Sequence, residues 1–85
     1  MNGTTIRTMQ LRDLAARVAH ARSAVAQQTI ERESAMRRDG AAHPRSIRAS
    51  RRLNRTQSAY RALVARYRVS AHEDARRSRG AGREA

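Results

Sequence analysis

The side chains with the most evident chemistry in this sequence are its arginines. Nineteen arginines stand against seven acidic residues, there is no lysine, and the net charge at pH 7 is +12. A guanidinium group is planar and permanently charged, and it donates parallel hydrogen bonds to phosphate or carboxylate oxygens. These residues therefore favour the binding of anions.

The arginines are densest in the second half of the chain. From Gly40 to His72 there are eight arginines and no aspartate or glutamate. In a helix, with about 100° between successive residues, most of these side chains lie along one flank and Arg51 points outward. We predict that six of them bind phosphates: Arg45, Arg48, Arg51, Arg52, Arg55 and Arg66. The alternative is a merely repulsive surface that salt relieves.

The start of this second segment adds to its positive potential. Pro44 suits the first turn of a helix, where its missing N–H group has no intrahelical partner. Arg45 and Arg48 follow without any acid, although the helix dipole favours negative charge at an N-terminus. An external phosphate, held by arginine side chains and free backbone N–H groups, would resolve this conflict.

Residues able to catalyse a reaction are scattered. His20, His43 and His72 are far apart and belong to no metal-binding motif; His43, which precedes Pro44, suits a turn or a cap. The sequence has no cysteine, and no serine or threonine is paired with a base as nucleophilic catalysis requires. We therefore predict that the protein is not an enzyme and uses no cofactor, metal ion or small-molecule substrate.

Two helices are predicted to position the arginines. In the first half of the chain, apolar and small residues recur every three or four positions, which is typical of a helix with one buried face: Leu11, Leu14, Val18, Ala21, Val25, Thr29 and Met36. A second stripe contains Ala49, Leu53, Thr56, Tyr60, Leu63, Val64, Tyr67 and Ala71. We expect both tyrosines to be core residues instead of platforms for base stacking.

The residues between the two stripes are typical of a turn. Gly40 can adopt the left-handed conformation that ends a helix, and a short connection returns the chain antiparallel to itself. We predict a single all-α domain, a two-helix antiparallel hairpin. Its first helix is expected at about 5–38, its turn at 39–43, its second helix at about 44–77 and a flexible tail at 78–85.

Large apolar residues are too few for a strong core. Seventeen of the 85 residues are alanine, and only eleven are leucine, isoleucine or valine. Combined with a high net charge, this composition is close to that of disordered chains. We therefore expect the isolated hairpin to be only marginally stable, and to be completed by self-association or by a partner.

One stretch resembles part of a known family. Residues 43–52, His-Pro-Arg-Ser-Ile-Arg-Ala-Ser-Arg-Arg, resemble the turn and second-helix start, P-x-x-I-R-x-x-R-R, of a small helical-hairpin protein of the large ribosomal subunit. The resemblance implies rRNA phosphate contacts for Arg48, Arg51 and Arg52. It covers these residues alone, and the first helix lacks the Leu- and Phe-rich core pattern of that family.

The preferred interpretation is a basic protein that binds nucleic acid, DNA or RNA, through phosphate contacts of the second helix. The alternative is a structural or adaptor protein that assembles with other chains in a virion, a secretion apparatus or a chaperone-like role. A helix lying on an anionic membrane is less favoured because Trp and Phe are absent. No stretch is apolar enough to span a membrane, and we expect a cytoplasmic location, or a virion if the chain is of phage origin.

Overall fold

The two stripes of apolar and small residues each lie on one long helix. The computed structural model describes the backbone of residues 3–84 and the side chains of residues 8–80. Helix α1 spans Gly3–Asp39 and helix α2 spans Pro44–Glu84, and the described residues contain no strand. The all-α helical hairpin predicted from the sequence is confirmed.

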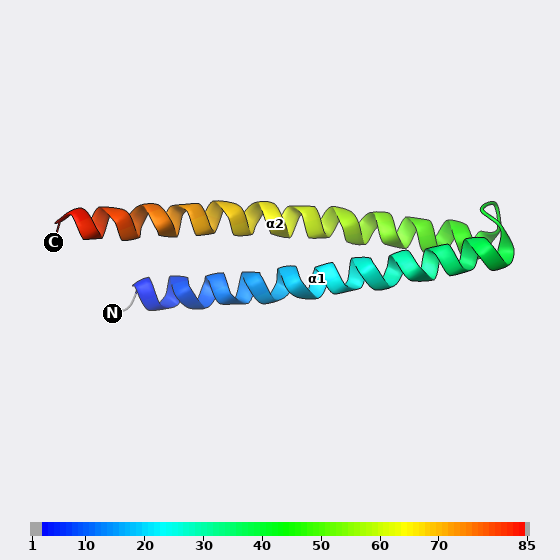
Figure 1. Ribbon diagram of the computed structural model, residues 1–85, viewed down its shortest axis with the longest axis horizontal. Helices are drawn as coiled ribbons and strands as arrows, with labels where there is room; N and C mark the ends of the chain where they lie inside the picture. Colours follow the sequence, from blue (N-terminus) through cyan, green and yellow to red (C-terminus); the bar gives the residue numbers. More distant parts are fainter. Residues whose placement is uncertain (1–2, 85) are drawn as a thin grey trace.

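The helices run antiparallel and pack side by side along the molecule (Figure 1). A helix of 41 residues is about 60 Å long, which is close to the 64 Å length of the molecule; the other two dimensions are 17 and 13 Å. The protein is therefore a rod two helices wide. We call the end that holds the connection the turn end, and the end where α1 starts and α2 finishes the open end.

The connection is held by backbone hydrogen bonds and by one histidine. Gly40 has a φ of 84°, a left-handed conformation that favours glycine, and its N–H group donates to the Met36 carbonyl at 2.9 Å. His43 caps α2 as expected, because its Nδ1 accepts a hydrogen bond from the Arg45 N–H group at 3.1 Å. The His43 carbonyl also accepts a hydrogen bond from the Ile47 N–H group at 3.0 Å.

The contact between the helices is a continuous row of buried and half-buried residues, which we call the seam. Its members recur at alternating spacings of three and four on both helices, the pattern with which two helices pack at a small crossing angle. On α1 they are Leu11, Leu14, Val18, Ala21, Val25, Gln28, Arg32, Ala35 and Asp39. On α2 they are Ser46, Ala49, Leu53, Thr56, Tyr60, Leu63, Tyr67, Ser70 and Asp74. Every residue of the two predicted stripes is likewise buried or half-buried.

The seam is a weak core. Among the described residues, the buried apolar side chains are Leu14, Ala35 and Leu53, which are 7%, 6% and 5% exposed. In the described part of the chain, three side-chain oxygens are buried without a hydrogen-bond partner: Gln28 Oε1, Asp39 Oδ2 and Ser46 Oγ. Each such atom costs about 1–3 kcal/mol, so polar burial offsets much of the stabilisation from the few buried apolar groups.

The predicted end of the second helix is wrong. Helix α2 continues through residues 78–84, which were expected to form a flexible tail; Ala85 lies outside the described residues. A glycine inside a helix costs about 1 kcal/mol relative to alanine, which weakens a helix without ending it. Gly80 does not adopt the positive φ of Gly40, so it is no stop signal. Helix α1 also begins slightly earlier than predicted, at Gly3.

Candidate nucleic-acid interface

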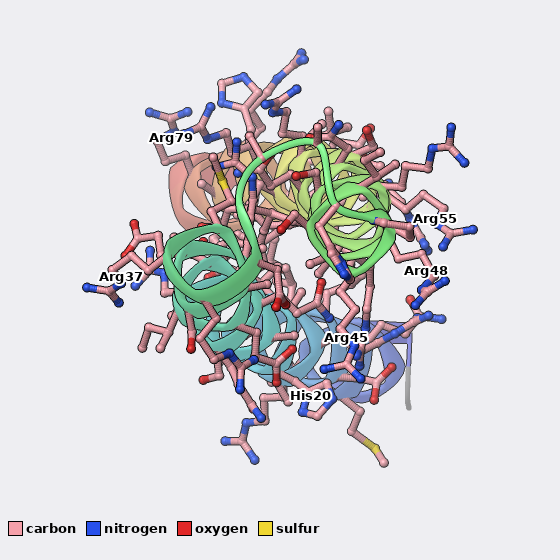
Figure 2. All side chains as sticks on the ribbon, turned by 90° about the vertical axis from the view of Figure 1, so that its right-hand side faces the viewer. His20, Arg37, Arg45, Arg48, Arg55 and Arg79 are labelled. Carbon is pink, nitrogen blue, oxygen red and sulfur yellow. The ribbon has the colours of Figure 1, made fainter. Side chains whose placement is uncertain are left out.

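Four arginines near the start of α2 form one exposed group at the turn end, which we call the arginine flank: Arg45, Arg48, Arg52 and Arg55. Their spacing of three and four residues keeps them on one side of the helix. Figure 2 views the rod from the turn end, and there Arg45, Arg48 and Arg55 project from one side of the bundle while Arg37 and Arg79 project from the other. Their guanidinium groups are therefore accessible together from one direction.

The other two predicted phosphate-binding residues lie apart from this flank. Arg51 is exposed, and its position between the two sides of α2, opposite the seam, directs it away from α1. Arg66 is exposed but lines a cleft between the helices nearer the open end, together with Arg17, Glu73 and Asp74. Acidic neighbours reduce the positive potential at Arg66, so it does not extend the arginine flank.

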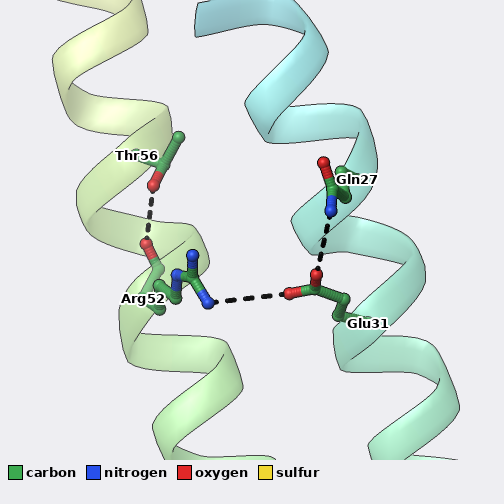
Figure 3. A network of polar contacts seen from close by, with 4 residues as sticks. All are labelled: Gln27, Glu31, Arg52 and Thr56. Carbon is green, nitrogen blue, oxygen red and sulfur yellow. Dashed lines mark hydrogen bonds and ion pairs between the residues drawn. The ribbon is translucent and has the colours of Figure 1, made fainter.

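One acid of α1 faces the arginine flank across the seam (Figure 3). Glu31 Oε2 lies 3.8 Å from Arg52 Nη1, and Glu31 Oε1 accepts a hydrogen bond from Gln27 Nε2 at 3.4 Å. The side chains of Arg52 and Glu31 are 65% and 46% exposed, and such solvated pairs contribute at most about 1 kcal/mol. A phosphate can therefore compete with Glu31 for Arg52.

The backbone at the start of α2 offers fewer donors to an anion than the sequence suggested. Pro44 has no N–H group, and the N–H groups of Arg45 and Ile47 donate to His43 Nδ1 and to the His43 carbonyl. The helix dipole adds positive potential at this end of α2. The first turn contains no acid that would offset it. The groups at this place that can bind an anion are therefore arginine side chains more than backbone N–H groups.

Two arginines of α1 are directed towards α2 and take part in holding the hairpin together. Arg32 Nε donates a hydrogen bond to Ser50 Oγ at 2.8 Å, and Arg22 Nε donates one to the Tyr60 hydroxyl at 3.5 Å. The hydrogen bond to Tyr60 raises the pKa of Arg22 above its ordinary value. Tyr60 and Tyr67 are half-buried in the seam, in agreement with the expectation that they are core residues.

The positive charge is distributed unevenly along the rod. Residues 15–68, which form the turn end and the middle, contain thirteen arginines and three acids. Residues 3–14 and 69–84, whose backbone lies at the open end, contain six arginines and four acids. A polyanion is therefore attracted to the turn end and the middle of the rod, where the arginine flank lies.

Other kinds of site are not apparent in the described part of the chain. Among these residues, no three histidine, cysteine or acidic side chains gather closely enough to hold a metal ion. The described stretches of α1 and α2 include no segment apolar and long enough to cross a membrane. Comparisons with protein-family models, curated proteins and solved structures gave no match.

Proposed function

We propose that this chain is a small, basic, non-enzymatic protein that binds nucleic acid through phosphate contacts. The arginine flank is the main contact surface, with Arg51 as a further contact. Arg66, which was also predicted from the sequence, lies among acids in the cleft nearer the open end and is not part of this surface. The observation that supports this proposal best is the exposure of four guanidinium groups on one side of a helix. Among the described residues, the acid within ion-pair distance of this group is Glu31, which lies beside Arg52. Such a surface matches the regularly spaced negative charges of a nucleic-acid backbone.

The expected contacts carry little sequence information. Reading bases in a single strand usually requires exposed aromatic rings, but the chain has no Phe or Trp and its two tyrosines are half-buried in the seam. Phosphate contacts fix the position of a protein on a duplex without selecting its sequence. We therefore expect binding to duplex RNA or duplex DNA with little preference among sequences.

Salt dependence is the first test of this function. Each phosphate contact releases counterions. The four contacts of the arginine flank should therefore contribute about −3 to −4 to the slope when the logarithm of affinity is plotted against the logarithm of salt concentration. Fluorescence anisotropy with labelled duplex RNA and DNA between 50 and 200 mM salt measures this slope. An affinity that hardly changes with salt, or no binding at the lowest salt, would contradict phosphate binding.

Glutamate substitutions test whether binding occurs at the flank or through net charge. The Glu31→Gln variant removes the acid that faces Arg52 and should raise the affinity for a duplex by up to about fivefold, the equivalent of ~1 kcal/mol. The Glu33→Gln variant makes the same charge change at another exposed position of α1 and should have a smaller effect. Equal gains in affinity would argue for diffuse attraction instead of a defined surface.

The weak seam supports a second candidate function. A rod with three buried apolar side chains among its described residues gains stability when another chain covers its half-buried residues. A structural or adaptor protein that assembles with other protein chains would have this property. Helix packing buries apolar surface and persists at high salt, whereas phosphate binding does not, so the salt titration distinguishes the two functions.

A further inference from the structure

A cleft lies between the two helices towards the open end. We call it the open-end cleft; its volume is about 360 Å³, and its charged lining consists of Asp13 and Arg17 from α1 and Arg66, Glu73, Asp74 and Arg77 from α2. Leu11 and Leu14 also line it. Leu14 is buried, but Leu11 is only half-buried by the hairpin. The cleft therefore combines balanced charge with apolar surface that remains accessible.

Within residues 8–80, whose side chains the structure describes, the charges of the open-end cleft form no ion pair. Among the described residues, none of its three acids lies within ion-pair distance of an arginine; the ion pair that forms is Glu31 with Arg52, elsewhere on the rod. Three acidic and three basic groups are therefore available to a partner. Carboxylates in the cleft repel a phosphate backbone, so the arrangement is unsuited to nucleic acid.

The rest of the described surface has a large excess of positive over negative charge. Outside the cleft, the described side chains include fourteen arginines but only the acids Glu31, Glu33 and Asp39. Two copies of this protein repel each other when such surfaces meet. The cleft is where two copies can approach with opposite charges facing each other.

We propose that two copies of this chain associate through their open-end clefts about a two-fold axis. A two-fold interface uses the same patch on both subunits, so the patch must be complementary to itself. The open-end cleft meets this requirement, because the acidic groups of one copy can face the basic groups of the other while the two copies cover Leu11. Charge complementarity thus identifies a second copy as the occupant instead of an acidic or a strongly basic partner.

The proposed dimer leaves the arginine flank free. The flank lies in the first turns of α2, next to the connection, whereas the residues that line the cleft lie towards the other end of both helices. Figure 1 shows these two ends of the rod. A dimer would therefore display two separate flanks and could contact two segments of a polyanion. The association itself requires no nucleic acid, so it stands or falls independently of the proposed function.

Exchange of charges between two variants tests this interface. Two variants place like charges opposite one another in the dimer: Glu73→Arg/Asp74→Arg and Arg66→Glu/Arg77→Glu. The dissociation constant of each homodimer should rise roughly tenfold or more. Mixed in equal amounts, the two variants should form a heterodimer because opposite charges face each other again. Sedimentation velocity over a range of protein concentrations measures the association, and circular dichroism verifies that each variant is helical.

Control variants change the net charge by the same amount outside the cleft. Two such controls should form dimers as tightly as the unmodified chain does: Glu31→Arg/Glu33→Arg and Arg61→Glu/Arg68→Glu. The proposal is overturned if the unmodified chain is monomeric at all concentrations, if the mixture of folded cleft variants fails to associate, or if the controls dissociate as readily as the cleft variants.

A labelling experiment tests the interface without altering its charges. The chain has no cysteine, so the Gln10→Cys variant carries a single thiol at an exposed position in the cleft, and the Ala42→Cys variant carries one at the turn. With pyrene attached, the label at position 10 should give excimer emission that increases with protein concentration, while the label at position 42 should not. Excimer emission from the label at position 42 alone would overturn the proposed orientation of the two copies.

Discussion

Replacing Arg45, Arg48, Arg52 and Arg55 together with glutamine is expected to weaken duplex binding by roughly 10³-fold at 0.1 M salt. Each phosphate contact contributes about 0.7–0.9 to the salt slope, so the slope itself should fall by about 3. Glutamine is a good helix former, and the four positions are exposed; the helix content should therefore change little. Fluorescence anisotropy at several salt concentrations measures the affinity and the salt slope, and circular dichroism measures the helix content.

The control for this variant removes the same charge from exposed positions of α2 outside the flank: Arg61, Arg68, Arg76 and Arg79. Arg79 projects away from the flank (Figure 2). We expect a much smaller loss of affinity and of slope. Equal losses from both quadruple variants would show that binding follows net charge and that no localised surface exists. No loss from either would favour the protein-assembly function.

The Leu53→Ala variant should lose most of its helix at low protein concentration. Leu53 is 5% exposed, and truncating a buried leucine to alanine costs about 2–5 kcal/mol. Folded domains are usually stable by only about 5–15 kcal/mol, and a hairpin with so few buried apolar groups belongs at the low end. Thermal and urea unfolding followed by circular dichroism give the change in unfolding free energy.

Val69→Ala is the matched control for this loss. Val69 is 59% exposed, so truncating it removes little burial, and the unfolding free energy should change by about 0.5 kcal/mol or less. If Leu53→Ala is no more destabilising than Val69→Ala, the seam does not hold the hairpin together in solution. The helices would then owe their stability to other contacts, such as those within the proposed dimer.

Periodicity and turn chemistry were sufficient to predict the hairpin. Leu14 and Leu53 belong to stripes whose spacing of three and four residues places them on one helix face, and the structure buries both. Gly40 was the natural place for a helix to end because it tolerates a positive φ, and it has one. The end of α2 was predicted wrongly because residues 78–84 contain two glycines and no large apolar residue that would extend the stripe, yet the helical backbone continues through them.

The grouping of Arg45, Arg48, Arg52 and Arg55 was also predictable from sequence, because residues three and four apart share one side of a helix. Single-helix spacing does not reveal which groups face each other across the seam. Arg52 meets Glu31, and the sequence separation between these two residues carries no signal of that contact. Arg66 belongs to the same flank on a helical projection, yet in the rod it lines the open-end cleft among acids.

The sequence by itself therefore determined the two helices, their turn, their buried faces and the excess of positive charge. These properties follow from local spacing and composition, since helical geometry relates each residue to its neighbours within the same helix. The tertiary structure decided the register of α1 against α2, and with it the pairing of Glu31 with Arg52 and the assembly of the open-end cleft. Register depends on how all the seam side chains fit together at once, because shifting one helix along the other exchanges every contact across the seam.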